Sequence, residues 1–199
     1  MGALSSATPT PKLATFEQLL QIPEDERFHE ILDGELVRKG LPSGEHSLGQ
    51  GNLRDWLSRF HRRPNGAERP GGWWILTEVT IELSPHQVVQ PDLAGWRRER
   101  MPEAPSGYPL RLRPDWVAEI FTDGDGRRRD GLLKRRLYAD HGIPHLWLVD
   151  VPKRQLVVLA LTPRGYQEVL VAGPGERVRA EPFAALELPV GVLFGDDPE

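Results

Sequence analysis

A single carboxylate inside an apolar strand is the feature that most constrains this chain. Residues 116–121 read WVAEIF, so Glu119 sits among bulky apolar side chains. Burying an unpaired carboxylate costs several kcal/mol, so such a charge needs a cationic partner, a metal ion or a raised pKa. From the residues alone two explanations stay open, a metal ligand and a partner of a buried arginine.

The strand period of two gives residues 116–121 two apolar faces. Val117, Glu119 and Phe121 share one face, and Trp116, Ala118 and Ile120 share the other. A strand that is apolar on both sides is predicted to be central in its sheet. Glu119 then lies near its carboxyl end, where open α/β sheets tend to place ligands.

A second acid lies in a similar setting. Asp92 follows Pro91 in the stretch VVQPDLAGW, which otherwise has strand character. Acids on neighbouring strands can converge on one divalent cation, and oxygen ligands suit Mg²⁺ or Mn²⁺. Magnesium usually takes one or two protein carboxylates and keeps several waters. The alternative is that Asp92 only caps a turn.

The stretch RRRDGLLKRRLYADHG predicts a helix over about 127–141. At about 100° per residue, Lys134 falls inside the apolar arc formed by Leu133, Leu137, Tyr138 and His141. A lysine in that arc is expected to direct its ammonium at an acid or a phosphate. Snorkelling to the surface is the alternative.

The remaining pattern predicts a mixed α/β domain with a central sheet. A short helix is expected within 15–26, ended by Pro23, and the Asp33-Gly34 pair predicts a two-residue hairpin turn. A second helix is expected from Ser43 to about residue 61, although Gly49 and Gly51 leave a later start open.

Strands are expected over the ranges 73–84, 88–96 and 115–122, and three more within 144–173, joined at the turns VPKR and TPRG. Because a helix separates the strand of Glu119 from HLWLVD, these two strands are expected to be joined by a crossover.

Composition limits the class of protein. The chain has 199 residues, 39% hydrophobic, and no uninterrupted apolar segment near the length of a membrane span, so we expect no membrane association. One domain is expected over 14–194, between a disordered tail at 1–13 and an acidic tail at 195–199. Without cysteine the chain is compatible with a reducing compartment, and we expect it in the cytoplasm.

The order Glu30, Asp92, Glu119, Lys134 supports a more specific prediction. Together with HEILDGELV, VVQPDLAGW, PDWVAEIF and LLKRRLYADHGIPHLWLVD, it resembles the Uma-type restriction endonuclease family, part of the PD-(D/E)XK nuclease superfamily. The resemblance implies a restriction-endonuclease-like fold, in which a mixed central β-sheet is flanked by helices and extended by N-terminal and C-terminal β-hairpins. It covers nearly all of residues 15–194.

The resemblance also implies roles for the four residues. Asp92 would be the aspartate of the motif, Glu119 its second acid, and Glu30 the acid that precedes them. The usual lysine position, two residues after the second acid, holds Phe121. Lys134 is therefore expected to replace that lysine.

The implied function is a Mg²⁺-dependent (or Mn²⁺-dependent) endonuclease that hydrolyses phosphodiester bonds in DNA. Asp92 and Glu119 would hold the metal, while His46 and the arginines Arg127, Arg128 and Arg129 would contact the substrate. Basic clusters at 97–100 and 111–113 could add phosphate contacts. A homodimer is expected, since cutting two strands is simplest with two symmetric sites.

One departure from the family pattern keeps an alternative open. After the second acid this chain has TDGDG, which puts Asp123 and Asp125 beside the expected site. They could add metal ligands, or they could repel a polyanion. The alternative is a catalytically inactive nuclease-fold module that binds nucleic acid or protein. The apolar hairpins within 146–172 could also serve an assembly role.

Overall fold

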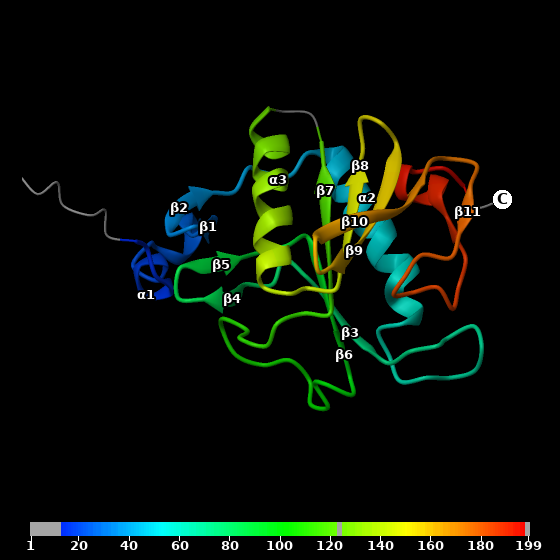
Figure 1. Cartoon of the computed structure of the whole chain (residues 1–199), viewed down its shortest axis with the longest axis horizontal. Helices are drawn as coiled ribbons and strands as arrows, with labels where there is room; N and C mark the ends of the chain where they lie inside the picture. Colours follow the sequence, from blue (N-terminus) through cyan, green and yellow to red (C-terminus); the bar gives the residue numbers. More distant parts are fainter. Residues whose placement is uncertain (1–12, 123–124, 198–199) are drawn as a thin grey trace, which may run out of the picture.

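The computed structural model describes residues 13–122 and 125–197, with the side chains of 125–130 left out. Over these residues the chain forms a six-stranded sheet, a four-stranded sheet and a two-stranded sheet, with α-helices packed on the largest one (Figure 1). This arrangement is the predicted mixed α/β, restriction-endonuclease-like fold.

The six-stranded sheet has the order β10-β9-β8-β7-β6-β3. Its strands are β3 (Trp73–Thr77), β6 (Leu93–Arg97), β7 (Trp116–Phe121), β8 (His145–Asp150), β9 (Gln155–Thr162) and β10 (Gly165–Ala172). Strands β7 and β8 are parallel, with Glu119 opposite Leu148, and the other pairs are antiparallel. The strand WVAEIF is therefore interior, as its two apolar faces predicted.

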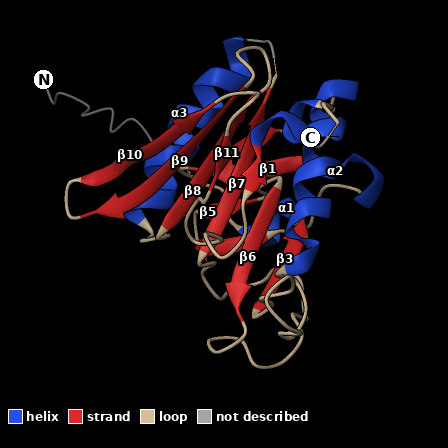
Figure 2. Cartoon of the chain, turned by 90° about the vertical axis from the view of Figure 1, so that its right-hand side faces the viewer, coloured by secondary structure: helices blue, strands red, loops and turns tan. Residues whose placement is uncertain are grey.

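Helices cover the two faces of this sheet: Figure 1 shows it between α3 (Asp125–Asp140) and α2 (Gly44–Trp56), and Figure 2 shows its strands side by side. Helix α3 is the crossover between β7 and β8, and its Leu137 and Tyr138 pack with Val117. Helix α2 packs its Leu53 and Trp56 on the opposite face. The predicted crossover is confirmed.

The face of the six-stranded sheet that α2 covers carries a core rich in aromatic rings. Phe183 packs against Trp116 and Trp147, with ring centroids 5.1 and 5.5 Å apart, respectively. Trp56 of α2 lies 6.3 Å from Trp147, also centroid to centroid. These rings bury large apolar areas and hold β7 and β8 rigidly under α2.

The four-stranded sheet has the order β2-β1-β5-β4. Its strands are β1 (His29–Leu32), β2 (Glu35–Arg38), β4 (Ile81–Ser84) and β5 (Gln87–Val89). Asp33 and Gly34 join β1 to β2 with φ of 51° and 79°. Positive φ at both central residues is what a tight hairpin of this kind requires, so the predicted turn is confirmed.

Two predicted strands were wrong in extent, because each is divided between the two sheets. The range 73–84 becomes β3 and β4, separated near Glu78, which adopts φ 51°. The range 88–96 becomes β5 and β6, separated at Pro91, which has no N–H for a sheet ladder. These two crossings join the four-stranded sheet to the six-stranded one.

The helices differ from prediction mainly in length. Helix α1 (Phe16–Leu19) ends before Pro23 and is followed by the 3₁₀ turn η1 (Glu24–Glu26). Helix α2 starts at Gly44, where the Ser43 side chain accepts a hydrogen bond from His46 N at 3.3 Å. This cap confirms the early start. A 3₁₀ turn, η2 (Leu57–Arg59), extends α2.

Strands β9 and β10 form the predicted C-terminal hairpin, and the chain then adds a short two-stranded sheet and a closing turn. Strands β11 (Arg177–Val178) and β12 (Leu188–Pro189) pair antiparallel, and η3 (Val190–Phe194) packs against α2. Asp196, in the expected acidic tail, forms an ion pair with Arg154 at 2.5 Å. Among the described residues no helix is long and apolar enough to cross a membrane.

Candidate active site

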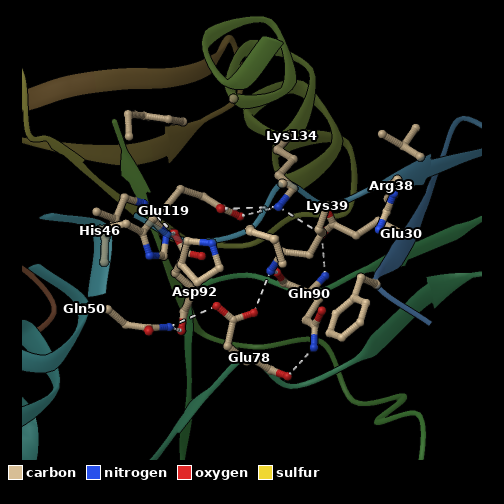
Figure 3. Close-up of a pocket in the computed structure, with 18 residues that line it drawn as sticks. Glu30, Arg38, Lys39, His46, Gln50, Glu78, Gln90, Asp92, Glu119 and Lys134 are labelled. Atoms are coloured by element: carbon tan, nitrogen blue, oxygen red, sulfur yellow. Dashed lines mark hydrogen bonds and ion pairs between the residues drawn. The ribbon is translucent and has the colours of Figure 1, made fainter. Parts of the chain in front are cut away.

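A cavity of about 360 Å³ lies where the two sheets, α2 and α3 meet. Its walls include all four residues of the predicted motif, Glu30, Asp92, Glu119 and Lys134, and also His46 (Figure 3). Each of these side chains is buried. The chain thus collects acids from both sheets and a lysine from the crossover helix around one space.

Lys134 connects the two sheets through their acids. Its Nζ lies 2.9 Å from Glu30 Oε1, and 3.2 and 3.3 Å from the two carboxylate oxygens of Glu119. Burial alone would lower the pKa of Lys134, but the charges of Glu119, Glu30 and Asp92 outweigh it and raise this pKa. Lys134 is therefore an ammonium that points into the site, and it does not snorkel.

Glu119 is the most perturbed acid of the site. Besides Lys134 it accepts a 2.5 Å hydrogen bond from the Tyr138 hydroxyl. Burial is the main cause that raises the pKa of Glu119 to about 7, and repulsion from Asp92 and Glu30 adds to it, against the opposing effect of Lys134. The partner of Glu119 is thus a lysine and a tyrosine, and not the arginine considered from the sequence.

Asp92 is held by the backbone of the neighbouring strand and by α2. Its Oδ2 accepts from Ile120 N at 2.7 Å and lies 3.1 Å from His46 Nε2. Burial acts to raise the pKa of Asp92, but the hydrogen bond and charge of His46, with smaller effects of Lys39 and Lys134, lower it overall. Asp92 is therefore an ionised carboxylate, fixed by side-chain and backbone donors.

Glu30 and His46 also occupy defined positions. Glu30 Oε1 accepts from Gln90 N at 2.6 Å in addition to its ion pair with Lys134. His46 Nδ1 is buried and has no hydrogen-bond partner among the residues that the structure describes. Glu35, an acid on the other strand of the β1–β2 hairpin, is exposed.

A polar network that the sequence did not reveal borders the cavity. Glu78 accepts from Lys39 Nζ at 2.6 Å and from Gln50 Nε2 at 3.1 Å. Its backbone carbonyl accepts from Gln90 Nε2 at 2.7 Å, and Asp92 O accepts from Glu78 N at 3.2 Å (Figure 3). Of the residues in this network, only Gln90 lies close in sequence to a predicted site residue, two positions before Asp92.

The predicted substrate contacts beyond His46 fall into two groups. The side chains of Arg127, Arg128 and Arg129, like Asp123 and the Asp125 side chain, lie outside the described residues. The cluster at 97–100 has structural partners: Arg98 lies over the Trp74 ring, 3.5 Å from its centroid, and Arg100 pairs with Asp115.

The cluster at 111–113 is similarly engaged. Arg111 Nε lies 2.8 Å from Glu82 Oε2, and Arg113 donates to the Gly142 carbonyl. Among the described residues that line the cavity of Glu119, none comes from 97–100 or 111–113. Both clusters thus have partners within the protein, away from the cavity of Glu119.

Comparison with known families decides what class of protein this geometry belongs to. The model of the Uma2 family, described as "Putative restriction endonuclease", matches residues 16–191, a range that contains all four motif residues. The chain belongs to the Uma2 family. The family of the sequence resemblance is thereby confirmed.

A solved structure supports the fold of this Uma2 protein. The crystal structure of a "putative nuclease belonging to DUF820" from Anabaena variabilis matches with a TM-score of 0.70 and 22% identity, over 91% of this chain and 97% of that one. A search of curated proteins finds no match. Membership of the Uma2 family points to a nuclease, and hence to nucleic acid as the substrate class.

Proposed function

We propose that this protein is a divalent-metal-dependent endonuclease that hydrolyses phosphodiester bonds in DNA. The observation that supports it most is the convergence of Asp92, Glu119, Lys134 and Glu30 on one cavity from two sheets and a helix. Buried charges of this number are costly, and they are retained most readily where they serve chemistry. We propose the cytoplasm as its compartment and a homodimer as its assembly.

The donor set fits Mg²⁺ or Mn²⁺. Asp92 and Glu119 are both buried, line the same cavity, and lie close enough that the charge of Asp92 raises the pKa of Glu119. Among the described residues no group of three or more histidine, aspartate or glutamate side chains is arranged as a metal site. Two carboxylates suffice for magnesium, which keeps several water ligands.

When bound by Asp92 and Glu119, the cation would polarise the scissile phosphate and neutralise charge on its oxygens. Lys134 would donate from its ammonium to the attacking water and to the developing negative charge. Glu30 would hold Lys134 in place through their 2.9 Å ion pair. His46 would keep the Asp92 carboxylate oriented through its 3.1 Å contact.

Plasmid cleavage by matched variants tests the proposal. Wild type is expected to nick supercoiled DNA with Mg²⁺ or Mn²⁺ and not with EDTA. Asp92→Asn and Glu119→Gln should lose at least about a hundredfold in rate, the size of effect seen for key electrostatic groups. Asp140→Asn, an exposed acid at the end of α3 that lines neither cavity, is the control and should cleave like wild type.

Calorimetry on the same samples separates the enzyme from its alternative. Metal binding and cleavage that are lost together in Asp92→Asn support the metal-dependent enzyme. An inactive module that binds nucleic acid would instead bind DNA equally with and without metal and would show no cleavage in wild type. Cleavage that persists at the wild-type rate in a purified Asp92→Asn protein would refute the proposed mechanism.

A further inference from the structure

A second cavity, about 600 Å³, adjoins the one that holds Glu119. The two cavities share Glu78 and Gln90 as lining residues. The other residues that line the second cavity include Arg27, His29, Arg54, His61, Thr77, Thr80 and Tyr108. A bound polymer that extends from the first cavity past Glu78 and Gln90 would therefore enter the second cavity.

Arg54 lines the second cavity with a guanidinium group that is not paired within the described part of the protein. It is half-buried on α2, and its guanidinium has no hydrogen-bond or ion-pair partner among the described residues. Burial lowers the pKa of Arg54, against the opposing effect of Asp55. Arginine stays charged in proteins, so partial burial of this guanidinium costs desolvation free energy that no partner offsets among the described residues.

Arg27 adds a second cation with a fixed position. Its guanidinium donates to the carbonyls of Leu20 and Ile22, at distances of 2.8 to 3.1 Å. Those bonds orient the group and leave its charge uncompensated by any carboxylate among the described residues. Guanidinium groups match the oxygens of phosphate and carboxylate groups, and a nucleic acid strand supplies phosphate.

The local acid does not cancel these charges. Glu78 is the one acidic side chain among the described residues that line the second cavity. It is paired with Lys39 at 2.6 Å, on the side of the first cavity. The second cavity therefore presents a net positive surface although the whole chain has a formal net charge of -4.

An exposed aromatic ring completes the second cavity. Tyr108 is 54% exposed, and it contacts Phe16 in an edge geometry with centroids 5.3 Å apart. His61 Nδ1 accepts a hydrogen bond from Ile75 N at 2.9 Å, so its proton is on Nε2 and can be donated. Cations beside an exposed aromatic ring are the combination that binds single nucleic acid strands.

We infer that the second cavity is a subsite for the nucleotide next to the scissile phosphate, with its phosphate bound by Arg54 and Arg27 and its base stacked on Tyr108. The inference rests on the proposed function, because the strand must pass through the first cavity. It places the substrate path over Glu78 and Gln90, away from the structural arginines at 97–100 and 111–113.

Binding of a fluorescein-labelled single-stranded DNA oligonucleotide, measured by anisotropy in EDTA, tests the inference without cleavage. Arg54→Gln should weaken binding by about tenfold, as loss of a charge-assisted hydrogen bond implies. The slope of log affinity against log salt should fall by about 0.7, the value for one phosphate contact on a single strand. Tyr108→Leu should weaken binding by about fivefold or more through lost stacking.

One control variant and two control measurements make the result specific. Arg164→Gln, an exposed arginine in the turn between β9 and β10, removes the same charge elsewhere and should bind like wild type. Thermal unfolding verifies that each variant is folded, which matters for Tyr108→Leu because Tyr108 contacts the buried Phe16. Plasmid cleavage by wild type is measured in parallel.

The possible outcomes test the proposed subsite independently of the proposed endonuclease activity. Weaker binding by Arg54→Gln and Tyr108→Leu supports it, whether or not wild type cleaves; absence of cleavage would then count only against the endonuclease. Unchanged binding by both variants overturns the subsite even if wild type cleaves. Wild type that binds no oligonucleotide overturns it too.

Discussion

Lys134 Nζ lies 2.9 Å from Glu30 Oε1, and this ion pair joins the crossover helix of the large sheet to the first strand of the small one. The same ammonium contacts both carboxylate oxygens of Glu119. One buried cation thus balances acids that come from two different sheets. Its removal should affect folding and catalysis together.

Lys134→Met should lower the free energy of unfolding by about 3 to 5 kcal/mol at pH 8, because it leaves buried carboxylates without their cation. The double variant Lys134→Met/Glu119→Gln should recover part of that loss. Lys153→Met is the matched control, since its ion pair with Asp150 is more exposed and should be worth about 1 kcal/mol or less. Urea denaturation of the four proteins, wild type included, measures these differences, and equal losses for the two lysine variants would contradict the prediction.

Glu119→Gln should change how stability depends on pH. The pKa of Glu119 is raised from 4.5 to about 7 in the folded protein, so the folded state binds more protons than the unfolded chain between these values. The stability contributed by Glu119 is fully present below pH 4.5 and is lost as the pH rises through 7.

The variant should therefore gain stability relative to wild type as pH increases from 4.5 to 8 in EDTA. Glu99→Gln, an exposed acid, serves as the control and should follow the wild-type curve. A constant difference between Glu119→Gln and wild type over this range would show that Glu119 keeps its ordinary pKa.

Tyr138→Phe tests the hydrogen bond that holds Glu119. Loss of the 2.5 Å bond to the carboxylate should cost about 1.5 to 3 kcal/mol of stability and should slow cleavage. Tyr166→Phe is the control, because its hydroxyl donates at 2.7 Å to the Ile143 carbonyl and Tyr166 does not line the cavity. It should cost about 1 kcal/mol and leave the cleavage rate unchanged; slower cleavage in both variants would indicate a general loss of folding.

Substitution by alanine at two helical glycines should change the stability of the protein in opposite directions. A Cβ on Gly51 of α2 would meet nothing within 4 Å, so Gly51→Ala should stabilise the protein by about 1 kcal/mol through helix propensity. A Cβ on Gly131 of α3 would lie 2.3 Å from the ring of Phe121, so Gly131→Ala should destabilise it by about 1 to 3 kcal/mol. Thermal unfolding of the two variants provides the test, and a gain in stability for both would contradict the predicted clash.

The sequence predicted the parts of the site that depend on local periodicity. The two apolar faces of WVAEIF located Glu119 in an interior strand, and the apolar arc of α3 located Lys134 toward the core. Both inferences need only the geometry of one element. Glu30 was selected by resemblance, because a hairpin glutamate is otherwise more often a solvated edge residue.

The sequence did not predict how the strands divide between sheets. Glu78 adopts φ 51°, a conformation that glutamate rarely takes and that no neighbouring residue signals. Tertiary contacts hold it there: Lys39 and Gln50 bind its side chain, and Gln90 binds its carbonyl. Such a network is assembled from distant segments, so no local pattern could reveal it.

The division of residues 73–97 between two sheets has a consequence for folding. Glu30 belongs to the small sheet, whereas Glu119 lies on the large one and Asp92 just before its strand β6. In a chain that is still folding, or partly unfolded, Glu30 stays apart from Asp92 and Glu119 until the two sheets have docked. The four-residue site is therefore complete only in fully folded molecules, so any property that needs all four residues would be the last to appear as the chain folds.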